Sequence, residues 1–296
     1  MFSLYVNNLL LTVIFFILVS WACYLPFSCG QLYNGPAFCA AISGYFAAYV
    51  TKCFHWPVLL GFFGGIVLAG LFALGLSLIL APFTGFQMAV ATMALIFIIQ
   101  TVLKNLDFLG GVVGMSGFPE IKNLLVIGLV SVVIVLILLH RLHNSRWGRA
   151  MEAVDVDSEM ARSMGIDAIK MSIVIQTISG TIGGLAGGIY TFALGTVHPE
   201  IFGFGLLLYT YTIIIVGGRH TPWGPLFFAP ILWLIPEFVP AGIVKYRNFM
   251  FGAIIIVFLL AMPEGVITKG LVRRIKFALV PKKAEGGGWV GNGKNT

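Results

Sequence analysis

Charge is the property that this sequence lacks most. No Asp, Glu, Lys or Arg occurs between Met1 and Thr51, and only 10% of the 296 residues are charged. Soluble proteins carry about 25% charged residues. Hydrophobic residues make up 59% of the chain, and its mean hydropathy is +0.99. This composition is typical of a membrane protein that crosses the bilayer several times, and it excludes a pair of soluble domains.

The sequence also lacks the motifs of the common catalytic and metal sites. It contains no G-x-x-x-x-G-K-[ST], so it builds no P-loop for ATP. It contains no H-E-x-x-H, no Ser-His-Asp candidate set and no His/Cys cluster with metal-ligand spacing. Its four cysteines match no zinc or redox spacing and are expected to pack as small apolar side chains. We therefore predict that the chain is not an enzyme and holds neither a metal nor a cofactor.

The net charge of +7 invites a nucleic-acid interpretation, but the distribution of that charge argues against it. Twelve of the 18 basic residues lie in two places, five in Arg141–Lys170 and seven in Lys269–Lys294. The positive-inside rule places both segments in the cytoplasm. No basic stripe alternates with aromatic residues, so no nucleic-acid partner is expected. We predict a transmembrane domain over 1–267, with a cytoplasmic loop at 143–170, and a basic, flexible cytoplasmic tail over 268–296.

Nine apolar stretches are candidate membrane spans. The first lacks a basic region before it and a cleavage site after it, so it is expected to be a retained span. The seventh is too short to cross unless it is extended or part of a broken pair. The stretches are Leu9–Leu25, Leu32–Val50, Trp56–Leu80, Gln87–Leu103, Asn123–Leu142, Met171–Leu194, Gly205–Val216, Pro222–Val239 and Asn248–Met262.

Two of these spans open with the same Gly-Pro-x-Phe sequence, at Gly35–Phe38 and Gly224–Phe227. Transporters often contain paired broken helices at equivalent places in two repeats. Two ordinary helix starts would give the same sequence pattern. Five spans before the charged loop place Met1 outside, whereas a re-entrant second span would place it inside. The expected fold is an all-α polytopic membrane protein with about 8–10 transmembrane helices and broken or re-entrant Gly-Pro segments. In the sixth span, a stripe of small residues predicts close helix packing, at Gly180, Gly184 and Gly188.

The loop at 143–170 is an island of charge between two long apolar runs. Asp157 is placed to accept backbone N–H bonds as the N-cap of a short helix. Gly165 can take the left-handed conformation that ends that helix, and Asp167 can cap the apolar helix that follows. Met160 and Met164, four residues apart, place two apolar side chains on one face. The pattern favours a docking surface, with an ordinary solvated loop as the alternative.

This loop and four further motifs resemble the permeases of branched-chain-amino-acid-type ABC transporters, a family that also includes urea and amide permeases. The loop resembles the segment on which the family's ATPase sits, except at Glu152 and Asp155, where basic residues are more usual. The other motifs are Gly30–Phe38, Gly110–Pro119, Gly217–Pro225 and Pro263–Gly265, in the family's order. By this resemblance, contact with the ATPase is assigned to seven residues: Arg149, Glu152, Asp157, Met160, Ala161, Met164 and Gly165.

The resemblance implies a subunit of the inner membrane that imports branched-chain or other small neutral amino acids. Its expected partners are a second homologous permease, two cytoplasmic ATPases that bind the ATP, an extracytoplasmic solute-binding protein and membrane lipid. The alternatives are a permease for urea or short amides and, from a different class, an ion-coupled carrier. The spans are nearly free of ionisable residues, Glu237 being the main exception, which leaves an ion-coupled carrier without its usual groups. Neutral polar side chains then line the expected substrate pathway: Gln31, Asn34, Gln87 and Gln176.

Overall fold

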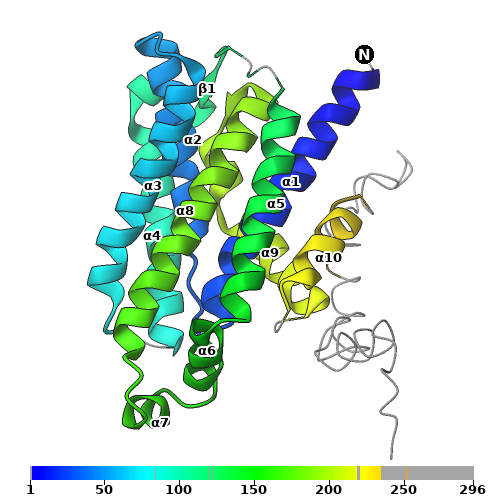
Figure 1. Cartoon of the computed structure of the whole chain (residues 1–296). Coiled ribbons are helices and arrows are strands. Elements are labelled where there is room, and N and C mark those ends of the chain that lie inside the picture. Colours follow the sequence, from blue (N-terminus) through cyan, green and yellow to red (C-terminus); the bar gives the residue numbers. More distant parts are fainter. Residues whose placement is uncertain are drawn as a thin grey trace, which may run out of the picture.

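The computed structural model describes residues 2–83, 85–119, 121, 123–218, 221–234 and 252. Its long helices form a bundle, with α6 and α7 at one end and the N-terminus at the other (Figure 1). We call the end that carries α6 and α7 the coupling end. The helices are α1 (Phe2–Phe27), α2 (Gly35–Cys53), α3 (Val58–Leu80), α4 (Gly85–Asn105), α5 (Leu124–His143), α6 (Arg146–Val156), α7 (Ser158–Ser163), α8 (Ala168–Leu194), α9 (Phe204–Gly217) and α10 (Trp223–Leu234).

Five of the described helices are long and apolar enough to cross a membrane: α1, α3, α4, α5 and α8. They correspond to the first, third, fourth, fifth and sixth predicted spans. The second predicted span forms α2, a continuous helix of 19 residues, and the seventh forms the short α9 of 14 residues. The eighth begins as α10 at Trp223, and its remainder and the ninth span lie outside the described residues, as do Glu237 and the predicted tail at 268–296.

The question of the N-terminal side is answered by the direction of the helices. Because α2 runs uninterrupted from Gly35 to Cys53, it does not re-enter as a short loop. The five helices that precede α6 alternate in direction, so the described start of α1 lies at the end opposite α6 and α7 (Figure 1). Five helices of alternating direction thus precede the charged loop, and four of them, α1, α3, α4 and α5, are long and apolar enough to cross a membrane.

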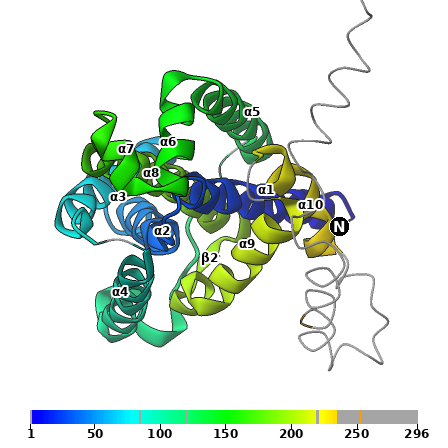
Figure 2. The same cartoon turned by 90° about the horizontal axis from the view of Figure 1, so that it is seen from below.

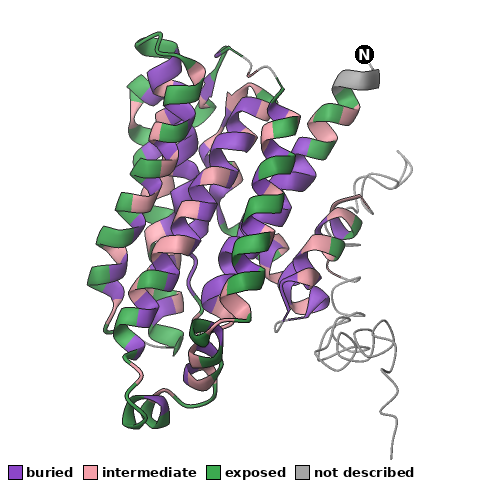
Figure 3. Ribbon diagram, in the orientation of Figure 1, coloured by how far each residue is buried: buried purple, intermediate pink, exposed green. Residues whose placement is uncertain are grey.

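The helix α8 lies in the centre of the bundle, packed against α1, α2 and α3 (Figure 2). In the apolar windows of α1 and α8, 83% and 67% of the residues are buried, compared with 22% in α4 and 28% in α5. The outward faces of α3, α4 and α5 are accordingly exposed apolar surface (Figure 3). Since apolar side chains at this surface would meet acyl chains, the burial pattern separates a protein core from a lipid-facing shell.

Glycines on two faces of α8 allow this close packing. Side chains of α3 lie close to where a Cβ of Gly180, Gly184 or Gly188 would be. A Cβ added at Gly184 would lie 2.5 Å from the Ala69 Cβ, and one added at Gly188 would lie 3.0 Å from the Phe62 ring. On the neighbouring face, a Cβ at Gly183 would lie 2.6 Å from the Pro36 carbonyl oxygen of α2. The three glycines that the sequence marks for packing therefore face α3, while Gly183 brings α8 onto the backbone of α2.

At the end opposite the coupling end, two short strands join distant loops. The strand β1 (Met115–Ser116) pairs antiparallel with β2 (Thr196–Val197). The preceding Gly-rich stretch forms two short 3-10 turns, and a Cβ at Gly114 (φ 78°) would collide with the Val197 carbonyl oxygen. The Gly-rich motif at 110–119 thus forms a closed turn at this end, a strand pair that the sequence analysis did not predict.

Both Gly-Pro-x-Phe sequences start helices, α2 at Gly35 and α10 at Trp223. The indole of Trp21 in α1 donates a buried 2.7 Å hydrogen bond to the Pro222 carbonyl just before α10, and Trp223 packs edge-on against His140 in the last turn of α5. The start of α10 therefore lies toward the coupling end, whereas the start of α2 lies beside Gly183, near the middle of α8. The symmetry between two repeats stays a prediction.

Candidate coupling segment and polar pathway

The charged loop folds into α6 and α7 with well-formed ends. The Ser145 side chain caps α6 by accepting from the Trp147 N–H at 3.1 Å. Asp157 caps α7, since its Oδ1 accepts from the N–H groups of Glu159 at 2.8 Å and Met160 at 3.1 Å. The chain then turns at Gly165 (φ 83°), a conformation that glycine adopts without strain. We call residues 144–167 the coupling segment, and its predicted N-cap and its left-handed glycine are both present.

Asp167 links the coupling segment to the central helix. Its Oδ1 accepts from the Lys170 N–H at 3.1 Å, and its Oδ2 lies 3.1 Å from the Lys170 ammonium nitrogen. The backbone hydrogen bond, with the side-chain contact of Lys170, lowers the pKa of the Asp167 carboxyl below its ordinary value. The carboxylate is thus held in its charged form at the positive N-terminus of α8.

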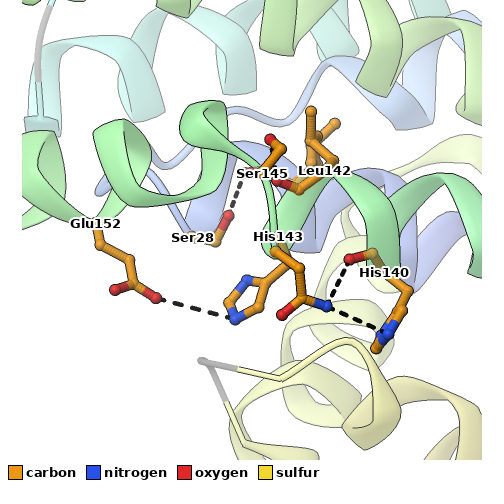
Figure 4. A network of polar contacts seen from close by, with 8 residues as sticks. Ser28, His140, Leu142, His143, Ser145 and Glu152 are labelled. Atoms are coloured by element: carbon orange, nitrogen blue, oxygen red, sulfur yellow. Dashed lines mark hydrogen bonds and ion pairs between the residues drawn. The ribbon is translucent and has the colours of Figure 1, made fainter.

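The seven residues assigned to ATPase contact do not share one environment. Met160 of α7 and Met164 just after it are exposed, at 59% and 74%, and with Val156 at the end of α6 they supply exposed apolar surface at the coupling end. Ala161 is 2% exposed, so it anchors α7 and does not belong to that surface. Arg149, Asp157, Glu152 and Gly165 are all exposed, and Glu152 lies 3.9 Å from His143 Nε2 (Figure 4).

The coupling segment also contacts the irregular stretch between α1 and α2, residues 28–34, which we call the link. Ser28 of the link lies beside Ser145 (Figure 4). Gly30 adopts φ 74°, and a Cβ on it would lie 2.9 Å from Asp155 Oδ1 and 3.3 Å from Asp155 Cα. Any larger residue at position 30 would push against the end of α6. The sequence connects the charged loop to α8, which follows it directly, but carries no local signal for this second contact.

Two of the four predicted pathway residues meet in what we call the glutamine cluster: Gln31 of the link with Ser172 and Gln176 of α8. Gln31 Oε1 accepts from Ser172 Oγ at 3.0 Å and from Gln176 Nε2 at 3.1 Å. Gln176 Nε2 also donates to Ser172 Oγ at 2.8 Å. Gln176 is fully buried, and its Oε1 has no hydrogen-bond partner among the described residues. A buried, unpaired amide oxygen costs about 1–3 kcal/mol, so this cluster is kept at an energetic cost.

Asn34, a third pathway residue, joins the link to α4 and α9. Its Nδ2 donates to Thr92 Oγ1 at 3.0 Å, and its Oδ1 accepts from Tyr211 Oη at 2.9 Å. Met88, one turn before Thr92, lies with its sulfur 3.9 Å from Gln176 Nε2, so the two polar groups adjoin. Gln87, by contrast, is exposed on the first turn of α4 and belongs to neither group. Among the described residues, no group of three or more His, Cys, Asp or Glu could hold a metal ion.

Comparison with known proteins places the chain in a family. The family described as "Branched-chain amino acid transport system / permease component" matches residues 5–259. The chain is 26% identical over 144 residues to the high-affinity branched-chain amino acid transport system permease protein LivM of Salmonella typhimurium, covering 49% of this chain and 34% of LivM. No solved structure matches it.

Sugar permeases are also among the relatives. The chain is 29% identical over 185 residues to the D-allose transport system permease protein AlsC of Escherichia coli, covering 60% of this chain and 56% of AlsC. It is 34% identical over 108 residues to the fructose import permease protein FrcC of Rhizobium meliloti, covering 35% and 30%. The chain thus spans between 30% and 56% of the length of these curated relatives. The family match and the helical bundle agree: the chain belongs to the permease-component family of branched-chain amino acid transport systems and is an all-α, multi-pass protein of the inner membrane.

Proposed function

We propose that this chain is the membrane-spanning subunit of an ATP-driven importer of branched-chain or other small neutral amino acids. Separate ATPase subunits bind and hydrolyse the ATP, a solute-binding protein delivers the substrate, and a second permease chain completes the pathway. The observation that carries the proposal is the coupling segment, a capped, water-exposed element with an apolar methionine surface that is joined to the central helix at Asp167.

The choice of an amino acid over a sugar rests on the family and on the nature of the polar groups. Gln31, Asn34 and Gln176 supply both amide donors and amide acceptors, which can meet an ammonium and a carboxylate without a buried charge of their own. The relatives named for fructose and D-allose make a sugar the competing substrate, and urea or a short amide is the other. An ion-coupled carrier is disfavoured because the glutamine and Asn34 groups contain no ionisable carboxyl, imidazole or ammonium side chain.

Uptake by proteoliposomes tests the proposal. The tagged chain is purified with its associated subunits, reconstituted with ATP inside the vesicles, and supplied with labelled leucine and the binding protein. ATP-dependent accumulation is expected, with competition by unlabelled valine and none by urea or D-fructose. Accumulation by the chain alone on an ion gradient would refute the ATPase assignment, and competition by D-fructose alone would refute the amino-acid assignment.

The assignment of α7 as the ATPase contact is tested by adding a charge to its apolar surface. In Met160→Glu a carboxylate replaces an exposed thioether at the proposed interface, so we expect at least tenfold slower uptake and loss of the ATPase subunits on purification. Val113→Glu places the same charge on an exposed apolar position, 79% accessible, at the opposite end. That control is expected to keep its ATPase subunits, and equal loss in both variants would contradict the assignment.

A further inference from the structure

A cavity lies directly beneath the glutamine cluster, between the coupling segment and the transmembrane helices. It has a volume of about 120 Å³. Its inner wall includes Cys29 and Gln31 of the link and Ser172 of α8. Its floor is made by the coupling segment, through Val154, Asp155 and Arg162. The cavity therefore connects the polar groups inside the bundle with the element that contacts the proposed motor.

The chemistry of the two walls differs. The inner wall presents neutral polar atoms: the Ser172 hydroxyl, and the Gln31 amide nitrogen, which donates to no described residue. Behind them lies the buried, unpaired Gln176 Oε1. The floor presents one charge of each sign, the Asp155 carboxylate and the Arg162 guanidinium. A zwitterion can engage both charges, whereas an uncharged sugar leaves both unused.

The size of the cavity indicates that its floor must move. A cavity of roughly 150 Å³ takes a benzene ring, and this one is smaller. A branched-chain amino acid has more non-hydrogen atoms than benzene, so the cavity must widen to hold one. The inner wall is held by buried helices, whereas the part of the floor on α7 has a single buried residue, Ala161. The α7 part of the floor is therefore the part of the cavity lining that can move.

We propose that this cavity is the cytoplasmic end of the solute pathway, that α7 is the movable part of its floor, and that Asp155 and Arg162 engage a zwitterionic solute as it leaves. This inference rests on the proposed function. It adds that the segment driven by the ATPase also closes the pathway, by lying across it beneath Gln31. The contact between Gly30 and Asp155 holds the α6 part of the floor, which does not move, against the link.

The native cysteines provide the test. Cys29 lines the cavity but is only 2% exposed, Cys39 is buried among helices at 0%, and Cys53 is exposed at the opposite end. The reconstituted complex is treated with methyl methanethiosulfonate, and modification of each cysteine is followed by peptide mass spectrometry. We expect Cys29 to react at least fivefold faster during ATP turnover than without ATP. Cys39 and Cys53 serve as the buried and exposed references, and their rates should not change.

The solute class is tested in the same assay. Leucine at saturating concentration should slow the ATP-dependent modification of Cys29 at least threefold, and D-fructose should not. If Cys29 is modified at the same rate with and without ATP, the proposal that the floor moves is wrong. If D-fructose slows the modification as much as leucine does, the proposed role of the two charges is wrong. Leucine uptake is measured on the same vesicles, so that a failed cysteine response with intact uptake rejects this cavity while the transport function stands.

Discussion

Replacement of Gly183 by alanine tests how the central helix is packed. In the native structure an added Cβ would lie 2.6 Å from the Pro36 carbonyl oxygen and 2.7 Å from its Cα, both backbone atoms of α2. Ordinary contacts begin near 3.4 Å, so α2 and α8 would have to separate by about 0.8 Å at this point. Backbone atoms cannot rotate away as a side chain can, and the strain therefore falls on the helix pair.

The expected magnitude is the difference between two effects. Overpacking of a close interface costs about 1–3 kcal/mol, and the better helix propensity of alanine returns about 1 kcal/mol. The net loss of up to about 2 kcal/mol corresponds to at most a roughly thirtyfold change in the unfolding equilibrium. It is measured by SDS unfolding in mixed micelles, followed by helical circular dichroism.

Two other glycines provide a graded comparison. Gly75 in α3 has no atom within 4 Å of an added Cβ, so Gly75→Ala is expected to be neutral or slightly stabilising. Gly188 would place its Cβ 3.0 Å from the Phe62 ring, which can shift, so Gly188→Ala should fall between the two. Equal stability of Gly183→Ala and Gly75→Ala would show that α8 does not depend on this backbone approach.

Three further outcomes follow from the geometry. Asp157→Ala removes the N-cap of α7 and should destabilise that helix by about 1 kcal/mol, seen as faster hydrogen exchange of the amides at 159–163; unchanged exchange would contradict the capping role. Because the pKa of Asp167 is lowered from 3.8, its contribution at the start of α8 is present above that value and lost as pH falls through the lowered pKa. The protection of the amides at 168–171, measured against the exchange rate of the unfolded chain at the same pH, should therefore fall only in acid, and Asp167→Asn should remove that pH dependence. Gln176→Leu removes a buried unpaired oxygen, so the stability of the bundle should stay within about 1 kcal/mol while uptake falls at least fivefold; loss of both in parallel would assign Gln176 a purely structural role.

The helices of this fold could be predicted from sequence because each long one has a local signal. Apolar runs bounded by Gly, Pro and charge located α1, α3, α4, α5 and α8, and the Asp157 and Gly165 pattern located the limits of α7. These signals depend on residues close in sequence. The strand pair β1–β2 has no such signal, because its two-residue strands are paired only by the loops that bring residues 115 and 197 together.

The position of the polar pathway was harder to predict, for a physical reason. In a membrane both the lipid-facing and the buried sides of a helix are apolar, so periodicity does not show which side a polar residue occupies. Gln87 and Gln176 look alike in sequence, but Gln87 is exposed on α4 and Gln176 is buried on α8. The contact between Gly30 and Asp155 could not be predicted from local sequence patterns either, because 125 positions separate the two residues.

The way the coupling segment is held indicates which of its parts moves. The helix α6 is fixed: Gly148 lies on the His143 backbone at the end of α5, and Met151 and Val154 are buried. The helix α7 is bounded by two turns, one at Asp157 and one at Gly165. A Cβ added at Gly165 would meet nothing within 4 Å. Short exposed elements with few buried contacts open at low free energy, so α7 can pivot between these turns while α6 stays in place. Because Arg162 lies on α7 and Asp155 on α6, such a pivot would part the two charges of the cavity floor and open it, without unpacking the buried contacts of α8.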